Sequence, residues 1–376
     1  MNNTSRKILP GLLAGMCMLL AGCDAGPSSP SAATGGAVDG IEQRLTGTPE
    51  DKAALRQLYQ QTLQSGETEA VIYISSVAEE VQPLADAFAR AFPGVRANFQ
   101  RLMGDKLRAR LDGEFRSGKR AGDIVIGGSI AQTLSSMPQD RWETFQPPTA
   151  TTLEARYRDA NGYYHIVYQK GFAIAYNPSL IAKEEVPRSI KQVLDPRWKG
   201  RYGHINFGAT LAGDAALMRL YRSGELTAAE LKDFIGGAGA PVPPSSELVP
   251  WVAQGRLIFT VWINAAAVLP QQAQGANVAL SFSPGLDILV DTGIGILRDP
   301  PHPHAAKLVT AWMFTPQAQQ ILADLNFYGV MPGAPKARDL PPRDQYLNKD
   351  FVEDQKALDQ LQQFRRNELA EILKKS

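Results

Sequence analysis

The sequence predicts an α/β protein built from parallel β-α-β units. Short, continuously apolar segments, such as Val71–Ile74 and Asp123–Ile126, alternate with longer segments in which apolar residues recur at helical spacing. This alternation is typical of buried parallel strands that are linked by helices. With 376 residues and 44% hydrophobic content, the chain is long enough for one large two-lobed unit or for two domains.

The first series of elements extends from residue 49 to residue 129. Leucine and tyrosine recur at helical spacing over 49–65, which predicts a helix there. The strand at 71–74 leads through Ser75 and Ser76 into an amphipathic helix, which ends at Pro93-Gly94. A strand at 95–99, a helix at 106–117 and a strand at 123–126 follow, and the last leads into the turn Gly127-Gly128-Ser129.

A second series repeats the alternation of strands and helices. The charged tail from Asn348 onward is predicted to be helical, and no internal repeat of fixed period is present. Strands are expected at 171–176, 202–206, 257–262, 278–282 and 288–296, and helices at 212–221, 228–234 and 305–314.

The N-terminus has the features of an export signal. Arg6 and Lys7 precede an apolar run from Ile8 to Leu20 that is short for a membrane span. The following residues up to Cys23 resemble a lipobox, which implies removal of residues 1–22 and acylation of the Cys23 thiol, with palmitate as a typical chain. A plain signal peptide with an incidental cysteine is the alternative. Several acyl chains would anchor the protein stably, because each buried methylene contributes about 0.8 kcal/mol.

Composition restricts the possible partners. Residues 23–48 are rich in Gly, Ser, Ala and Pro and predict a flexible tether. Loss of residues 1–22 moves the formal charge from +1 to −1, since it removes two basic residues and no acidic one, so no nucleic-acid partner is expected. The cysteines are Cys17 and Cys23, which leaves the mature chain without a disulfide, a zinc site or a cysteine nucleophile. We expect a monomer.

Short motifs recur in a fixed order over about residues 66–335. They are Val71–Ser76, Gly122–Val125, Tyr176-Asn177, Asp195–Gly200, Pro301–Lys307 and Thr315–Gln319. In order and spacing they resemble the motifs of type II periplasmic solute-binding proteins of the ferric-iron and phosphonate-binding-like branch. The segment Asp195–Gly200 is close to that branch's Asp-Pro-x-Trp-Lys-Gly signature.

The resemblance implies two Rossmann-like lobes joined by two crossing strands, which close on a ligand like a hinged clamp (the venus-flytrap fold). Lobe 1 would comprise residues 49–167 and 290–345. Lobe 2 would comprise residues 168–289, with residues 346–376 as a C-terminal helix. The resemblance also implies a receptor of an ABC importer, whose permease subunits recognise the closed form.

The turns after the strands supply candidate ligand contacts. In open parallel sheets, ligands lie beyond the carboxyl ends of strands, next to helix N-termini that favour anions. Ser75 and Ser76 follow the first strand, Gly128 and Ser129 follow the third, and Thr210 has the same place in the second lobe. Helix capping by the serines and turn geometry at the glycine are the alternatives.

One departure from the ferric branch concerns its metal ligands. That branch binds iron with two adjacent tyrosines that follow a strand and an asparagine. Alignment of Gly255–Asn264 with this segment places Ala265 and Ala266 on the tyrosine positions. Alanine offers no oxygen donor to iron, so we expect no metal ligand and no cofactor, with a register shift as the alternative.

Side chains near the second lobe and the crossings are further candidates. The ring of Trp262 can hold an organic cation or an apolar group, with core packing as the alternative, and Asn264 can donate or accept hydrogen bonds. Asp287, near the second crossing, is a candidate for a cationic group or for a hinge cap. Three basic residues could pair with a phosphonate or carboxylate: Lys106, Lys170 and Arg201. The sequence does not rank them.

The motifs favour binding over catalysis. No Gly-x-Ser-x-Gly, His-Glu-x-x-His or P-loop motif occurs in the sequence, so we expect no enzyme. The favoured hypothesis is a receptor that delivers a small polar or anionic ligand to an ABC importer. A ferric-iron-binding protein with atypical ligands and a ligand-sensing accessory of a two-component system are the alternatives. Asp24 resembles an inner-membrane retention signal, which places the anchored protein on the periplasmic side of that membrane.

Overall fold

The structure is a computed structural model, and its description covers most of the chain after residue 37. The predicted signal peptide, Cys23, Ser129 and Thr210 lie outside the described residues. Within the described part, no helix is both long enough and apolar enough to cross a membrane. The described residues are 38, 40–76, 78–102, 104–128, 130, 133–134, 137–205, 207, 211–239, 245–349 and 355–374.

The first predicted helix is α3 (Pro49–Gln64), and its start has a capping box. The Thr48 hydroxyl accepts from the Asp51 amide at 3.1 Å, and the Asp51 carboxylate accepts from the Thr48 amide at 3.0 Å. The other elements of this series form close to their expected positions. They are β1 (Glu69–Ile74), α4 (Ala78–Ala91), β2 (Arg96–Arg101), α5 (Gly104–Ser117) and β3 (Ile124–Ile126).

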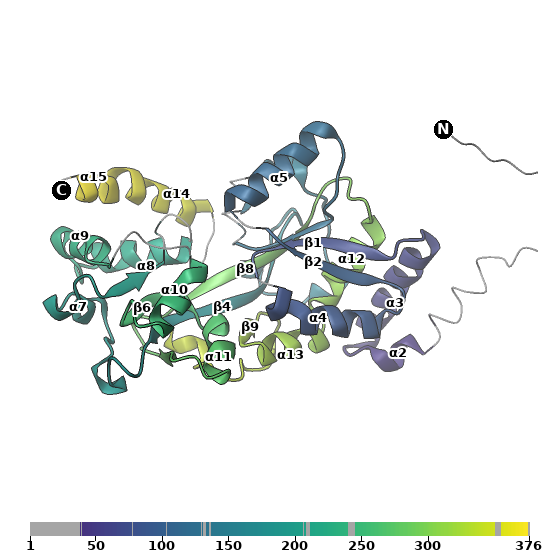
Figure 1. Cartoon of the computed structure of the whole chain (residues 1–376). Coiled ribbons are helices and arrows are strands. Elements are labelled where there is room, and N and C mark those ends of the chain that lie inside the picture. Colours follow the sequence, from purple (N-terminus) through teal and green to yellow (C-terminus); the bar gives the residue numbers. More distant parts are fainter. Residues whose placement is uncertain are drawn as a thin grey trace, which may run out of the picture.

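Two long strands run between the two halves of the molecule (Figure 1). β4 (His165–Tyr176) and β8 (Ile288–Ile296) pair in antiparallel fashion, with His165 opposite Ile294 and Phe172 opposite Ile288. β4 begins six residues before the expected start at residue 171. Its first half contains buried polar residues, which interrupt the apolar run by which the strand was predicted.

The second half is also a mixture of strands and helices. β5 (Tyr202–His204) pairs in parallel with β6 (Phe259–Asn264), and β7 (Ala279–Ser281) pairs with β4. The helices around them are α7 (Ile190–Val193), α8 (Leu211–Arg222), α9 (Ala228–Gly236), α10 (Ser245–Ala253) and α11 (Ala265–Ala273). After β8, the chain forms α12 (Pro303–Trp312), α13 (Pro316–Asp324), β9 (Phe327–Gly329), α14 (Gln355–Gln363), a π-helical turn (Phe364–Leu369) and α15 (Ala370–Lys374).

The strands form one mixed sheet, in the order β2-β1-β3-β8-β4-β6-β5, with β7 and β9 also paired to β4. β1 pairs in parallel with β2 and β3, as the β-α-β prediction requires. The crossing strands pair in antiparallel fashion and lie between the two parallel regions. The α/β fold class is therefore confirmed.

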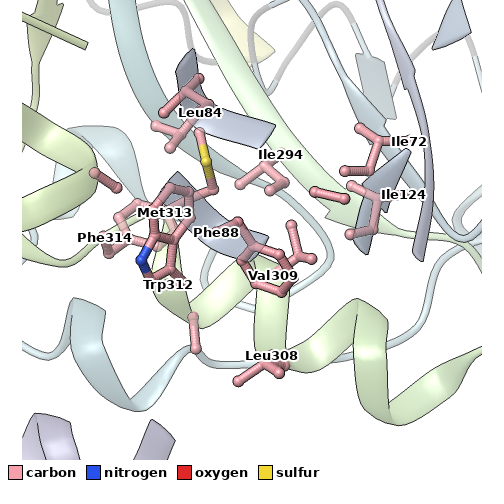
Figure 2. Close-up of a cluster of buried hydrophobic side chains, with 14 of the residues drawn as sticks. Ile72, Leu84, Phe88, Ile124, Ile294, Leu308, Val309, Trp312, Met313 and Phe314 are labelled. Carbon is pink, nitrogen blue, oxygen red and sulfur yellow. The ribbon is translucent and has the colours of Figure 1, made fainter. Parts of the chain in front are cut away.

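Each half has its own hydrophobic core. The first core contains Phe88 of α4 and Trp312 of α12, whose ring centroids lie 5.5 Å apart (Figure 2). It draws on residues 38–168 and 294–330, together with Ala266. The second core draws on residues 174–288 and 347–372 and is rich in aromatic rings. Because the chain crosses between the cores more than once, neither half is a continuous segment.

The end of the predicted tether is part of the folded structure. Residues 41–44 form the short helix α2 (Ile41–Arg44), and Val38, Ile41 and Leu45 are buried in the first core. The prediction of a tether over 23–48 was therefore wrong for its last residues. The buried apolar side chains and a hydrogen bond from Arg44 to the Ala91 carbonyl at 3.2 Å hold this segment on the domain, although its overall composition is typical of a tether.

The C-terminal helices lie on the second half of the molecule. Leu361 and Phe364 are buried in the second core, and Arg365 forms an ion pair with the fully buried Asp214 of α8. Arg222 and Glu368 add a second ion pair at 2.5 Å between α8 and this segment. The charged tail is thus fixed to lobe 2 through one face.

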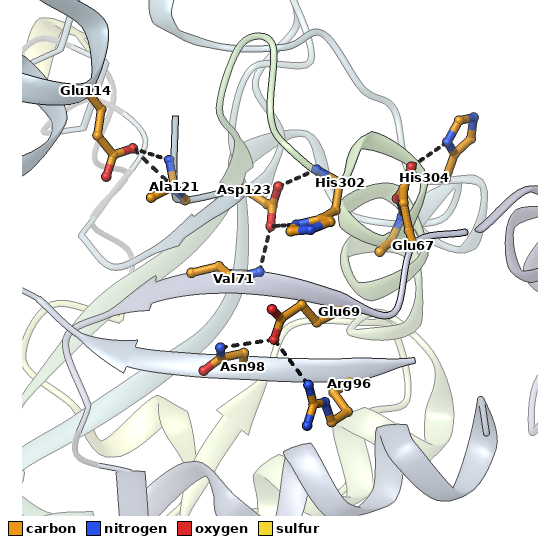
Figure 3. Close-up of polar contacts among 12 residues, drawn as sticks. Glu67, Glu69, Val71, Arg96, Asn98, Glu114, Ala121, Asp123, His302 and His304 are labelled. Carbon is orange, nitrogen blue, oxygen red and sulfur yellow. Dashed lines mark hydrogen bonds and ion pairs between the residues drawn. The ribbon is translucent and has the colours of Figure 1, made fainter. Parts of the chain in front are cut away.

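A buried carboxylate ties α12 to the central strands of the first half (Figure 3). Asp123 is fully buried and accepts hydrogen bonds from the Val71 amide at 2.6 Å and the His302 amide at 2.7 Å. The His302 ring lies 3.0 Å from the same carboxylate. Burial raises the pKa of Asp123, while these hydrogen bonds favour its ionised form.

We predict that Asp123→Ala destabilises the protein by about 2–5 kcal/mol, because it leaves buried amide groups without an acceptor. Urea unfolding followed by circular dichroism measures the change. Asp86→Ala removes an exposed hydrogen bond to Gln82 in the same half and should change stability by less than about 0.5 kcal/mol. Equal effects of the two substitutions would contradict the role assigned to Asp123.

Candidate functional site

The candidate site lies beyond the end of β1, where the side chain of Ser76 meets that of Lys170 in the crossing strand β4. Ser75 and Ser76 directly follow β1, as predicted. The Ser75 amide continues the strand ladder to Ile126 at 3.3 Å, and Ser75 is half-buried. Ser76 is 3% exposed, and its hydroxyl lies 3.2 Å from Nζ of Lys170 in β4. One of the two predicted serines therefore contacts a residue of the connection between the halves.

The turn after β3 is held by a buried tyrosine. The Gly127 amide donates to the Gly293 carbonyl at 3.0 Å and lies 3.1 Å from the Tyr164 hydroxyl. That hydroxyl in turn donates to the Gly127 carbonyl. The Gly128 carbonyl accepts from the Gly293 amide at 2.9 Å. Gly128 has φ 70°, a left-handed conformation that suits glycine. The turn is thus fixed to β8, and the Gly127 amide is already used within the protein.

Lys170 is a buried cation at the centre of the connection. Its side chain projects toward Ser76, is 8% exposed, and lies within 6 Å of the ring centroids of Tyr168 and Phe327, at 5.9 and 5.7 Å. Burial lowers the pKa of Lys170, and the nearby Glu80 carboxylate opposes this shift. Lys170 is opposite Val290 of β8 and Phe327 of β9, so it lies between two neighbouring strands.

Trp262 does not present its ring to a solute in this structure. It is fully buried, and its indole NH donates to the Leu286 carbonyl at 2.6 Å. Its ring packs edge-on against Phe207 and Phe234, with centroids 6.0 Å away in both cases. Its φ of 60° is rare for a bulky residue and lies where the pairing of β4 with β6 shifts register. Core packing therefore explains Trp262.

The remaining second-lobe candidates have local structural roles. Asn264 is half-buried and caps α11, since its side chain accepts from the Ala266 amide at 3.2 Å. It lies opposite Phe172 of β4, next to the connection. Ala265 and Ala266, on the expected tyrosine positions, begin α11 and are buried. Thr210 and Ser129 lie outside the described residues, so their predicted contacts remain predictions.

Asp287 is a buried carboxyl group behind the start of β8. It is 2% exposed, and one of its oxygens accepts from the Ser283 amide at 2.7 Å, which is the hinge-capping role considered from the sequence. Its other oxygen, Oδ1, has no hydrogen-bond partner in the part of the chain that the structure describes. Burial raises the pKa of Asp287 to about 8. This arrangement does not offer a charged carboxylate to a solvent-exposed cation.

The histidines are all engaged within the protein. His165 and His204 are both buried. The His165 ring lies within hydrogen-bond distance of the Phe145 carbonyl, and the His204 ring lies within hydrogen-bond distance of the Ile205 and Ile235 carbonyls. His302 caps α12 ahead of Pro303 and pairs with Asp123, while His304 pairs with Glu67 at 2.8 Å. Within the described residues, no group of three or more His, Cys, Asp or Glu side chains could hold a metal ion.

Sequence reasoning did not single out three residues that organise the site. Lys170 was one of three unranked basic residues, and Tyr164 and Tyr168 were not among the candidates. Tyr164 is fully buried, and a Cβ at Gly293 or Gly295 would lie within 2.5 Å of its ring. The two glycines of β8 were therefore the available sequence signal, because they mark a close approach to the strand.

The molecule is a two-lobed α/β protein with two long strands between its cores. Polar turns lie at the carboxyl ends of its parallel strands. This is the architecture of a solute-binding receptor. Residues 74–320 match the family model described as bacterial extracellular solute-binding protein. The chain belongs to this family, which consists of extracellular or periplasmic binding proteins.

Individual relatives agree with this assignment. The Fe(3+)-binding periplasmic protein of Serratia marcescens is 24% identical over 238 residues, which cover 56% of this chain and 69% of the relative. Iron-bound HitA from Pseudomonas aeruginosa superposes with a TM-score of 0.60 and 19% identity, over 78% of this chain and 98% of HitA. AfuA from Actinobacillus pleuropneumoniae, with exogenous fructose-6-phosphate bound, gives a TM-score of 0.60 and 16% identity, over 81% of this chain and all of AfuA. These structures confirm the type II venus-flytrap fold.

We predict that Asp287 makes folding stability depend on pH. Its pKa is raised to about 8 in the folded protein, so the folded state retains a proton that the unfolded state releases near pH 4. Stability should therefore fall between about pH 4 and pH 8, with a limiting slope of about 1.4 kcal/mol per pH unit from this group. Asp287→Asn should remove this part of the slope, as measured by urea unfolding at several pH values. Identical slopes for wild type and variant would show that Asp287 is ionised in the fold.

Proposed function

We propose that the protein is a membrane-anchored extracytoplasmic receptor that delivers a small polar or anionic solute to an ABC importer. The observation that carries this proposal is the position of Lys170 and Ser76. They bring a cation and a hydroxyl together where lobe 1 meets the crossing strands, within a family of solute-binding proteins. We infer that the two lobes are formed by separate parts of the chain. Lobe 1 would comprise residues 49–167 and 290–345, and lobe 2 would comprise residues 168–289 with 346–376. No catalytic step is required for this function.

Binding would work through a shift between open and closed forms. A solute that contacts both lobes favours the closed form by the difference between its affinities for the two forms. The permease subunits would then bind the closed receptor. The strands β4 and β8 are suited to act as the hinge, because their pairing links two separate hydrophobic cores.

Ferric iron is a second candidate ligand, because the Serratia marcescens relative is named as a Fe(3+)-binding protein. In this chain, the positions aligned with the paired tyrosines are Ala265 and Ala266, which are buried at the start of α11. Iron prefers hard oxygen donors, so binding would require other ligands. We therefore favour an anionic solute over the free metal.

Anchoring would follow from acylation of Cys23 after removal of residues 1–22. The segment between Cys23 and α2 would then be a tether of fewer than twenty residues, since α2 begins at Ile41. Asp24 would retain the lipoprotein at the inner membrane, on its periplasmic side and close to the permease. The receptor would act as a monomer.

We predict that a bound solute makes the full-length protein more compact and more stable. The protein, purified in detergent, is tested with fructose 6-phosphate, inorganic phosphate, citrate and ferric citrate. A solute at one hundred times its Kd should stabilise the fold by about 2.7 kcal/mol, which thermal unfolding detects. Contrast-matched small-angle scattering should show a smaller radius of gyration for the same solute. Unchanged scattering and unchanged stability with every solute would contradict the receptor function.

We predict that Cys23→Ser abolishes incorporation of radiolabelled palmitate and releases the protein from the membrane fraction. Loss of the thiol removes the acylation site, and the remaining mature chain has no other cysteine. Cys17→Ser is the matched control, since Cys17 lies within the predicted signal, and it should leave labelling unchanged. Continued labelling of the Cys23→Ser protein would rule out the proposed anchor.

A further inference from the structure

The burial of Lys170 has no compensating ion pair. Its side chain is 8% exposed, and the hydroxyl of Ser76, at 3.2 Å, is the partner of Nζ. Within the part of the chain that the structure describes, no carboxylate lies within 4.0 Å of Nζ. Buried ammonium groups are normally paired, because removal of a charge from water costs several kcal/mol. Among the residues that the structure describes, the lysine therefore retains donors without an acceptor.

A second polar group beside Lys170 also lacks a partner. The hydroxyl of Tyr168, two residues earlier on the same face of β4, makes no hydrogen bond within the described residues, although the residue is 1% exposed. Burial raises the pKa of Tyr168, and the side chains of Ser76 and Thr292 oppose this shift. An unpaired buried hydroxyl is rare in folded proteins, and it commonly marks a site that is completed by a ligand or water.

The stacked rings of Tyr168 and Phe327 form one wall of this position. Their centroids lie 4.8 Å apart, and Lys170 is within 6 Å of both. The rings exclude water from one side of the ammonium group, which strengthens its interaction with an anion. Ser76 lies directly after β1, so the polar groups at this position come from two parts of the chain far apart in sequence.

We propose that Lys170 is the residue that recognises solute charge, and that the solute is an anion whose carboxylate or phosphoryl oxygens bind between Lys170, Ser76 and Tyr168. This inference rests on the proposed receptor function and names its substrate class. An oxyanion accepts hydrogen bonds from an ammonium and two hydroxyl groups without needing a donor of its own. A bare ferric ion at the same position would be repelled by the ammonium group.

The test compares binding and stability in the full-length protein, purified in detergent. Lys170→Met keeps an unbranched side chain that is shorter by one heavy atom, and it removes the charge. Isothermal titration with fructose 6-phosphate, inorganic phosphate and citrate should show at least about tenfold weaker binding of the preferred anion. Unliganded Lys170→Met should unfold at the same or a higher temperature than wild type, because an unpaired buried charge has been removed. A residue with a merely structural role would not combine these two effects.

Two further variants provide controls. Lys199→Met removes an exposed lysine from the surface of the second half and should leave anion binding unchanged. Ser76→Ala removes the hydroxyl partner of Lys170 and should weaken binding of the same anion several-fold. It tests the site independently if Lys170→Met does not fold. Uncharged fructose is the matched probe for fructose 6-phosphate and should not bind measurably.

The outcomes separate this inference from the receptor function. The inference is overturned if Lys170→Met binds the anion as tightly as wild type does. If Lys170→Met does not fold, equal affinity of Ser76→Ala and wild type overturns it instead. Compaction and stabilisation by ferric chloride or by fructose, without binding of any anion, also overturns it but leaves the receptor function in place. Absence of binding by every probe overturns both.

Discussion

The antiparallel pairing of β4 with β8 is the contact on which the rest of the molecule depends. Each strand begins in one hydrophobic core and ends in the other, and the register keeps Phe172 opposite Ile288 and His165 opposite Ile294. Because side chains alternate along a strand, a slip of one residue would exchange the two faces of the connection. The same pairing therefore fixes both the fold and the chemistry presented between the lobes.

The two faces of this connection carry different polar groups, with a lysine on one and carboxyl groups on the other. Tyr168 and Lys170 project to the face on which Ser76 lies, whereas Gln169 projects to the other and donates to Asp291 at 2.7 Å. On the second face, burial raises the pKa of Asp291 and of Asp287. A polar connection of this kind contributes less to stability than an apolar one would. Its composition is consistent with the proposed binding of a ligand between the lobes.

The fold was largely predictable because most elements have local signals. The apolar run of β1 and the helix α3, predicted from its recurring leucine and tyrosine residues, lie where the sequence predicts them. The sequence failed where buried strands contain polar residues, as in the first half of β4. It also missed α10 and α11, each of which contains an internal proline, at Pro250 and Pro270. Proline normally argues against a helix interior, and the surrounding packing overrides that preference here.

The candidate site was less predictable than the fold, since it depends on strand register. Ser76 follows from the position of β1 alone. Lys170 becomes a site residue only when β4 lies between β8 and β9, which places its side chain beside two rings. Trp262 illustrates the opposite case. Its position at a strand end suggested a ligand contact, but a local shift in pairing and an acceptor at Leu286 place the ring in the core.

The likeness to iron-binding proteins and the proposed preference for anions are compatible, because fold and ligand charge are set by different residues. The fold needs buried strands and two cores, which many sequences satisfy at the low identities seen here. Ligand charge depends on a few side chains between the lobes. In the function proposed here, Ala265 and Ala266 in place of oxygen donors would remove affinity for a hard cation, and a buried amine at Lys170 would add affinity for an oxyanion. Two local changes can thus reverse the charge of the ligand while the hinge and the lobes stay the same.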